Sequence, residues 1–303
     1  MTDPQPTLPR YNISSTGAPT SIDAWSSLRL PFEPDGWPRD FRHDLQIAIR
    51  TLNPQPATCL HAIYTSPSND RCDVDNILFY NLGPATFAHA MGSGVRFERV
   101  IAIPPACPTP IANDRPLVLH HYHYAFAPYD ASWQSWLPNT TLATWEVSLE
   151  SSDLKGCATL WRAMKRGSVK MLAERAAGND PFGLKITLAG PKRSTSRLQT
   201  QLKPLLDGVI SALHRYDGEP PSEVCRLIAG RLGEDDDTVH TWLTDRVSSV
   251  LGPRALVHTF RTGIQWNPAD DACYAGDIRI TEMPGQLTLR GEVMTLRAAP
   301  VAD

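Results

Sequence analysis

Aspartates stand at two places in this chain with neighbours and spacings that suit a divalent cation. Mg²⁺ and Mn²⁺ prefer hard oxygen ligands, which proteins usually supply as carboxylates from separate elements together with water. Such an ion activates water and stabilises the charge that develops on a phosphate during displacement. Asp73 and Asp75 form the first place, and their spacing puts both carboxylates on one side of an extended stretch. We predict a second or degenerate metal site at this pair.

Asp207 and the later pair Asp270-Asp271 form the other place. Asp207 is expected at the start of a helix over residues 203–216, and the pair at a turn between strands. Lys203 precedes Asp207 by one helical turn, so it faces the same ligand at i, i+4. We predict that Asp207, Asp270 and Asp271 bind Mg²⁺ or Mn²⁺. Lys203, Asp207 and Asp271 are the predicted catalytic residues, with Lys203 neutralising a phosphate oxygen or orienting a hydroxide.

A simpler role exists for each of these carboxylates. At a helix start, Asp73 and Asp75 would cap free backbone N–H groups and complement the helix dipole, which needs no metal. Asp270 and Asp271 follow Pro268 in a Pro-x-Asp-Asp pattern that is typical of a turn between strands. Both interpretations stay open on the sequence alone.

The second aspartate pattern resembles that of the RusA-type Holliday junction resolvases. In that family Lys-Pro-Asp-x-Asp-Asn leads into a helix, and a strand then ends near Asp-Asp. The matching residues are Lys203, Pro204, Asp207, Asp270 and Asp271, together with Asp73, Asp75 and Asn76 in the first half. The chain departs from the pattern at Leu205 and Gly208, which stand where the family has Asp and Asn. The resemblance implies that the acidic residues bind Mg²⁺ and that the chain cuts branched or duplex DNA.

Basic residues in two stretches could contact phosphates. Arg162, Arg166 and Lys170 recur every four residues along a helix expected over 153–177. A second set, in a stretch without acids, comprises Lys192, Arg193 and Arg197. We predict nucleic-acid contacts at both sets. The alternative is a solvated helix face and an exposed loop.

His121 and His123 lie on the same face of a strand expected over 117–127. Two histidines with this spacing can bind zinc. The sequence offers no third ligand, so we expect instead an aromatic sheet face in which the imidazoles are hydrogen bonded.

Composition limits the class of protein. The 303 residues are 42% hydrophobic and 20% charged, with a net charge of −3, as in a soluble globular protein without a global basic field. The six cysteines form no C-x-x-C pair, which favours reduced thiols over a zinc knuckle. No apolar run reaches the ~20 residues of a membrane helix, and the first residues lack a signal-peptide pattern. We therefore expect a cytoplasmic protein without membrane contact.

Hydrophobic periodicity predicts an α+β fold of two similar modules. Each module has a strand, one or more helices and then three strands, and forms a mixed sheet with helices packed on one face. The expected domains are an irregular N-terminal arm over 1–36, a first module over 37–180 and a second over 181–303. Trp161 lies on the apolar stripe of the longest expected helix and is a predicted core residue.

Two functional hypotheses follow. The first is a Mg²⁺-dependent phosphodiesterase or nuclease that acts on nucleic acid. The alternative is a non-catalytic binding or scaffold protein, an interaction subunit on a duplicated α+β fold whose aspartates only cap helices. Proximity of the Asp207 and Asp271 carboxylates would favour the enzyme, whereas separation would favour the scaffold.

Overall fold

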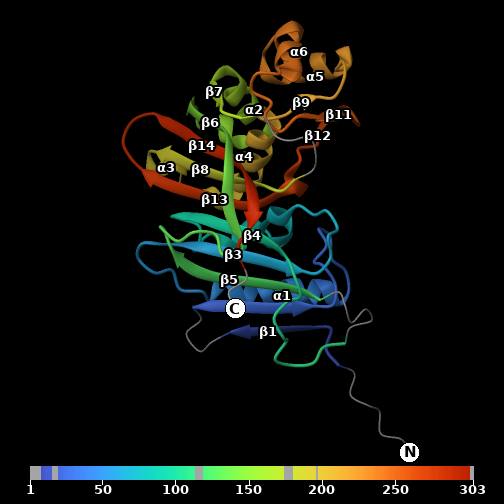
Figure 1. Ribbon diagram of the computed structural model, residues 1–303, viewed down its shortest axis with the longest axis vertical. Helices are drawn as coiled ribbons and strands as arrows, with labels where there is room; N and C mark the ends of the chain where they lie inside the picture. The colour runs from blue at the N-terminus through green and yellow to red at the C-terminus, as the bar shows by residue number, and fades with distance from the viewer. Residues whose placement is uncertain (1–7, 16–19, 113–118, 174–179, 196, 301–303) are drawn as a thin grey trace, which may run out of the picture. The chain divides into compact units, whose positions relative to one another are not determined.

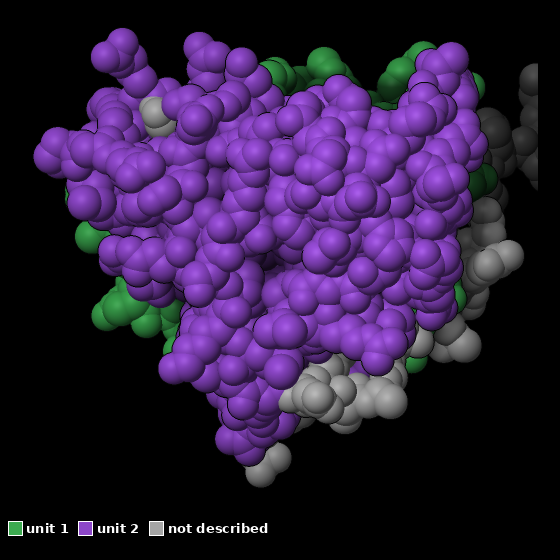
Figure 2. Space-filling view, turned by 90° about the horizontal axis from the view of Figure 1, so that it is seen from above, with its two compact units in different colours: residues 1–135 green, residues 136–303 purple. Residues whose placement is uncertain are grey.

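The computed structural model describes residues 8–15, 20–112, 119–173, 180–195 and 197–300, and the predicted α+β class is confirmed (Figure 1). The chain divides into two compact units, Met1–Ser135 and Trp136–Asp303, whose residues Figure 2 shows in separate colours. This division differs from the boundary expected near residue 180, and Gly178 and Asn179 at that boundary lie outside the described residues.

Unit 1 contains a mixed sheet with the strand order β1-β2-β5-β3-β4. The strands are β1 (Tyr11–Ser15), β2 (Ser21–Ser26), β3 (Thr58–Ser66), β4 (Gly94–Ile101) and β5 (His120–Pro128). β3 and β4 run parallel, and the other neighbours run antiparallel. The predicted N-terminal arm therefore includes two paired strands among its described residues.

Helix α1 (Trp37–Arg50) of unit 1 forms as its periodicity predicts. Phe41, Leu45 and Ile49 are fully buried, and Pro38 occupies the first turn, where its missing N–H has no intrahelical partner. The helices expected over 74–82 and 85–91 are shorter and irregular. They are a π-helical turn, η1 (Asn76–Tyr80), and a 3₁₀ turn, η2 (Pro84–Phe87).

Unit 2 contains a mixed sheet with the strand order β13-β8-β14-β6-β7. The strands are β6 (Trp136–Leu149), β7 (Ser168–Met171), β8 (Phe182–Gly190), β13 (Cys273–Glu282) and β14 (Leu287–Ala298). β8 and β13 run parallel, and the other neighbours run antiparallel. In unit 1 the neighbouring strands β4-β3-β5-β2 show the same pattern as β13-β8-β14-β6 of unit 2. In each set the first two strands run parallel and the following neighbours run antiparallel.

Helices and short elements of unit 2 connect these strands. The helices are α2 (Cys157–Arg166), α3 (Lys192–Thr195), α4 (Leu198–Ala212), α5 (Ser222–Leu232) and α6 (Asp236–Thr244). The short elements are η3 (Asp153–Lys155), β9 (Arg215–Tyr216), β10 (Pro253–Arg254), β11 (Val257–Phe260), β12 (Gly263–Trp266) and η4 (Asp270–Ala272). Within the described ranges, no helix combines the length and apolar character that a membrane crossing needs.

The prediction of one long helix over residues 153–177 is wrong. Helix α2 ends at Arg166, and the chain continues through Gly167 into strand β7. A Cβ atom at Gly167 would lie 2.5 Å from Cγ2 of Val147, so glycine allows the chain to pass close to β6 and pair with it. Lys170 consequently lies in a strand and not on the helix with Arg162. The prediction for Trp161 is confirmed, because its side chain is fully buried.

Helix α4 begins at Leu198, earlier than expected, and Pro204 lies inside it. Asp207 is therefore a mid-helix residue, and the expected helix start at Lys203 is wrong. A proline within a helix removes one backbone hydrogen bond. Burial of Leu198, Leu202 and Leu205 on one side of α4 offsets that loss.

Candidate functional site

Lys203 lies between two carboxylates in unit 2. Its Nζ is 2.8 Å from Oδ1 of Asp207 and 2.6 Å from Oδ2 of Asp270. Lys203 and Asp207 are one turn apart on α4, and Asp270 opens η4 just before strand β13. The Lys203 side chain is 22% exposed and that of Asp270 only 9%, so these charges interact with little screening. The structure thus brings three of the predicted residues together, with the carboxylates of Asp207 and Asp270 on either side of the Lys203 ammonium group.

Gly208 lets helix α4 approach helix α2 closely beside this cluster. A Cβ atom at Gly208 would lie 2.8 Å from Cβ of Leu160 and 3.1 Å from the carbonyl oxygen of Cys157. Glycine is therefore required at this contact, which gives a packing reason for one departure from the resolvase pattern. Burial in the same contact, together with the charge of Asp207, raises the pKa of the Cys157 thiol well above its ordinary value.

Asp271 faces a different cation. Its Oδ1 lies 3.6 Å from Nη1 of Arg254, and Arg254 also donates from Nε to the carbonyl oxygen of Asn267 at 2.7 Å. Adjacent residues Asp270 and Asp271 thus pair with separate basic side chains. Arg254 was not among the predicted site residues, because no motif surrounds it in the sequence.

The acidic residues of this cluster do not fit a divalent metal as they are arranged. Lys203 already bridges Asp207 and Asp270, and Arg254 pairs with Asp271. Across the part of the chain that the structure describes, no three His, Cys, Asp or Glu side chains converge as a metal site would require. A divalent ion between Asp207 and Asp270 would have to displace the lysine.

Asp75 of unit 1 lies in a helical turn that begins at Val74, and Asp73 directly precedes this turn. Asp75 has φ −65° and ψ −35°, which are helical and not extended values. The Asp73 carboxylate accepts a hydrogen bond from Nδ2 of Asn76 at 2.8 Å. The extended geometry predicted for this pair is therefore wrong at Asp75, and this hydrogen bond joins the Asp73 carboxylate to the side-chain amide of Asn76.

Asp23 is the hydrogen-bond partner that His121 and His123 share, and the sequence did not reveal it. Its Oδ1 lies 2.9 Å from Nε2 of His121 and 2.9 Å from Nδ1 of His123. Strands β2 and β5 bring these groups together, with Asp23 directly opposite His123. Burial alone would raise the pKa of Asp23, but the hydrogen bonds from both imidazoles outweigh it and depress this pKa. As expected, the imidazoles are hydrogen bonded.

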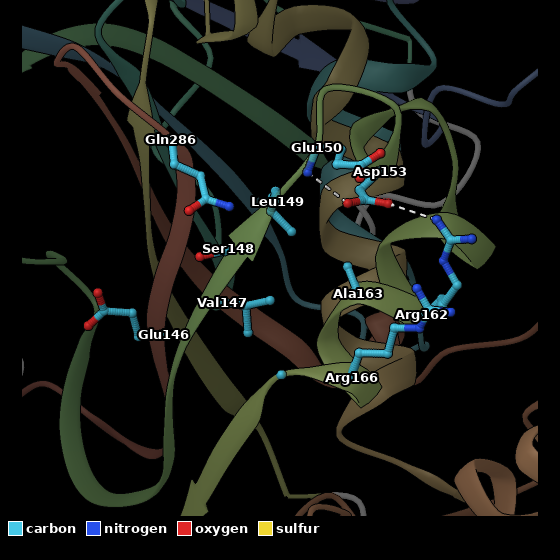
Figure 3. Close-up of a pocket in the computed structure, with 11 residues that line it drawn as sticks. Glu146, Val147, Ser148, Leu149, Glu150, Asp153, Arg162, Ala163, Arg166 and Gln286 are labelled. Atoms are coloured by element: carbon cyan, nitrogen blue, oxygen red, sulfur yellow. Dashed lines mark hydrogen bonds and ion pairs between the residues drawn. The ribbon is translucent and has the colours of Figure 1, made fainter.

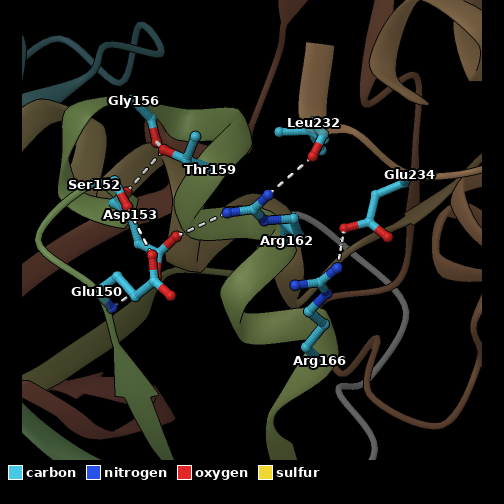
Figure 4. Close-up of polar contacts among 9 residues, drawn as sticks. All are labelled: Glu150, Ser152, Asp153, Gly156, Thr159, Arg162, Arg166, Leu232 and Glu234. Atoms are coloured by element: carbon cyan, nitrogen blue, oxygen red, sulfur yellow. Dashed lines mark hydrogen bonds and ion pairs between the residues drawn. The ribbon is translucent and has the colours of Figure 1, made fainter. Parts of the chain in front are cut away.

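The basic residues expected to face phosphates on α2 are engaged within the protein (Figure 4). Arg162 donates to the carbonyl oxygen of Leu232 at 2.9 Å and to Oδ1 of Asp153 at 3.2 Å. Arg166 forms an ion pair with Glu234. These contacts reduce the positive field that a phosphate would meet, although the Arg166 side chain stays 56% exposed.

The second basic set is more open. Lys192 lies 3.6 Å from Glu282. Arg193 and Arg197 are exposed and have no ion-pair partner within the described ranges. Lys170 is also exposed, on β7. Of the predicted phosphate contacts, Arg193, Arg197 and Lys170 are the least neutralised in the part of the chain that the structure describes.

A pocket of about 310 Å³ lies between the end of β6 and helix α2 (Figure 3). Backbone and side chains of Val147–Glu150 form one wall, and Arg162, Ala163 and Arg166 form the other. Its lining combines acidic, basic and apolar groups, as small-ligand and peptide sites often do. No sequence motif pointed to this pocket.

No protein-family model, no curated protein and no solved structure matches this chain.

Proposed function

We propose that this chain is a cytoplasmic, non-catalytic binding protein that serves as an interaction subunit. The observation that carries the proposal is the Lys203 ammonium between the carboxylates of Asp207 and Asp270. A built-in cation neutralises this pair, so the cluster stabilises unit 2 without a metal. All six cysteines are free thiols, which supports a reducing compartment.

We further propose that the two units arose by duplication of one α+β module. In each, a parallel pair is followed by a strand that returns antiparallel beside the first strand of that pair: β3, β4, β5 and β8, β13, β14. The strands β2 and β6 then flank β5 and β14, respectively. Homologous sequences whose two halves align at these strands would support duplication, and relatives that contain one half with a different strand order would contradict it.

A Mg²⁺-dependent phosphodiesterase or nuclease is the second candidate. The observation that favours it is the meeting of Lys203, Asp207 and Asp270, as the resemblance to the resolvases implies. The exposed side chains of Arg193 and Arg197 would then contact phosphates of the nucleic acid. In such an enzyme Asp207 and Asp270 would hold Mg²⁺ or Mn²⁺ after displacement of the Lys203 ammonium, and the ion would supply Lewis-acid chemistry.

Labelled branched, duplex and single-stranded DNA and RNA, incubated with wild-type protein and Mg²⁺ or Mn²⁺, separate the two candidates. The binding protein should leave every substrate intact. Cleavage that Asp207→Asn abolishes and Asp130→Asn preserves would overturn the proposal and support the nuclease. Asp130 is a suitable control because it is exposed and lies in the other unit.

A further inference from the structure

Strand β6 is only partly covered on the side of β7. β14 pairs with β6 from Trp136 to Leu149, whereas β7 pairs only with Ala143–Glu146. Beyond Glu146 the chain of β7 has already turned through Gly167 into helix α2. The last residues of β6 therefore line the pocket of Figure 3 with a free edge.

Ser148 is the residue whose backbone faces this free edge. The carbonyl oxygen of Leu142 accepts hydrogen bonds from Leu172 and Ala173, so it points to the β7 side. Backbone groups of every second residue point to the same edge, which includes Glu146 and Ser148. The pairing of β6 with β14 shifts register beside Leu142 and is regular from Ala143 to Leu149. The backbone of Glu150 bonds to Asp153 on the α2 side, which gives Ser148 the same direction when counted from the other end of the strand.

The neighbours of Ser148 along this edge already have partners. Glu146 stands opposite Ser168 of β7. The N–H of Glu150 donates to Oδ2 of Asp153 at 2.9 Å. Among the described residues, the N–H and C=O of Ser148 have no backbone partner on this edge, and Ser148 is exposed, so a ligand can reach these groups.

Arg166 favours a negatively charged ligand at this edge. Its side chain lines the pocket and is 56% exposed, and its one ion pair within the described ranges joins Nη2 to Glu234. A guanidinium has five N–H donors, so the remaining donors of Arg166 can bind a carboxylate. Arg166 would meet a side chain that leaves the added strand toward α2.

We propose that this pocket binds an extended peptide segment of a partner protein, which pairs with Ser148 and places an acidic side chain against Arg166. Addition of a strand to an exposed sheet edge supplies main-chain hydrogen bonds for affinity, and the flanking side chains supply specificity. The inference rests on the proposed binding function and names the class of partner. Binding uses no residue of the Lys203 cluster.

Fluorescence polarisation with the full chain tests the proposal. The probe is a labelled, end-blocked peptide of sequence Thr-Val-Thr-Val-Glu-Val-Thr, and its comparison peptide has Gln in place of Glu. We expect the Glu peptide to bind at least about tenfold more tightly, and Arg166→Gln to remove that preference. Ser148→Pro should abolish binding, because it deletes the free N–H without removing a bond to β14. Ser148→Ala retains the backbone and should bind like the wild type.

Hydrogen exchange provides a measurement that does not depend on whether Ser148→Pro folds. The bound peptide should slow exchange of the Ser148 amide while leaving that of the Val147 amide unchanged. No binding of the Glu peptide, or binding that Arg166→Gln and Ser148→Pro leave unchanged, overturns the proposal. Concentration-dependent dimerisation that Ser148→Pro abolishes would overturn it too, since the occupant would be a second copy. Nuclease activity would refute the proposed function while leaving these binding results intact.

Discussion

The Lys203 ammonium lies 2.6 Å from Oδ2 of Asp270, although 67 positions separate the two residues in the chain. Asp207, one turn along α4, lies 2.8 Å from the same ammonium. One lysine therefore connects α4 to the turn that begins strand β13. Removal of the Lys203 ammonium should therefore change both the free energy of unfolding and the binding of divalent cations.

Lys203→Ala should lower the free energy of unfolding by about 1–3 kcal/mol at pH 7, because it leaves two neighbouring carboxylates without their shared cation. The same variant should gain a response to divalent cations, since two facing carboxylates can take an ion once the ammonium is gone. Mg²⁺ or Mn²⁺ at ten times its dissociation constant would restore about 1.4 kcal/mol. Thermal melts with and without the metal measure both effects.

Two variants serve as controls for that prediction. Lys203→Arg retains the positive charge and should show no gain from metal. Lys203→Ala combined with Asp207→Asn should lose the gain. An equal rise of melting temperature in wild type and Lys203→Ala would contradict the idea that the lysine occupies the cation position.

Two helical glycines should respond oppositely to alanine. Gly208→Ala should destabilise the protein by about 1–3 kcal/mol, because the new Cβ would overlap Leu160 across the contact of α4 with α2. Gly230→Ala on α5 should stabilise it by up to about 1 kcal/mol, because outside its own helix backbone no described atom lies within 4 Å of the added Cβ, and alanine favours the helix. Urea titration of both variants compares them directly. Equal effects would show that the close approach at Gly208 does not constrain the packing.

The sequence predicted those helices whose first and last residues are determined by neighbours in the sequence. The apolar positions of α1 and the Pro38 start are adjacent in sequence, and α5 ends at Gly233, which has the left-handed φ of 70°. The end of α2 is not local. Residues after Gly167 continue the helical stripe, but pairing of β7 with β6 determines their conformation. A single sequence carries no direct signal of that contact.

The candidate site shows the same division between local and distant information. The spacing of Lys203 and Asp207 predicts their contact, because one helical turn separates them. The pairing of Asp271 with Arg254 and the free edge at Ser148 depend on tertiary packing. Asp23 was missed because it lies in a stretch without periodicity, and only the pairing of β2 with β5 brings it to His121 and His123.

Asp23→Asn should lower the free energy of unfolding by about 1–3 kcal/mol at pH 7, because the amide forms weaker hydrogen bonds with His121 and His123 than the carboxylate does. The folded-state pKa of Asp23 is depressed below its ordinary value. Its contribution is therefore present above the unfolded pKa of about 4 and is lost as the pH falls through the folded pKa. Denaturant titrations at pH 7 and below pH 4 should show the variant and wild type converging. A constant difference over that range would mean that the carboxylate charge is not the cause.

A buried lysine on α2 provides the last prediction. Lys165 Nζ is 2.9 Å from Oγ of Ser248 and 3.4 Å from Oδ2 of Asp245, and its side chain is only 2% exposed. Burial lowers the pKa of Lys165, and this effect outweighs the charge of Asp245, which acts to raise the pKa. In the alkaline range between that folded pKa and the ordinary value of about 10.4, the unfolded chain binds more protons. Stability should therefore rise with pH in that window.

Lys165→Met should destabilise the protein by about 1–3 kcal/mol at pH 7, because Asp245 loses its cation, and it should remove the alkaline rise in stability. Lys165→Met with Asp245→Asn should be less harmful than the sum of the single changes, with a coupling of at least about 0.5 kcal/mol. Lys155→Met, at an exposed position, should stay within about 0.5 kcal/mol of wild type. Denaturant titrations of the three variants and of Asp245→Asn at pH 7 and pH 9.5 give both quantities. Additive effects of the two changes would show that the ion pair of Lys165 with Asp245 does not contribute to stability, in contrast to the bond of Lys165 with Ser248.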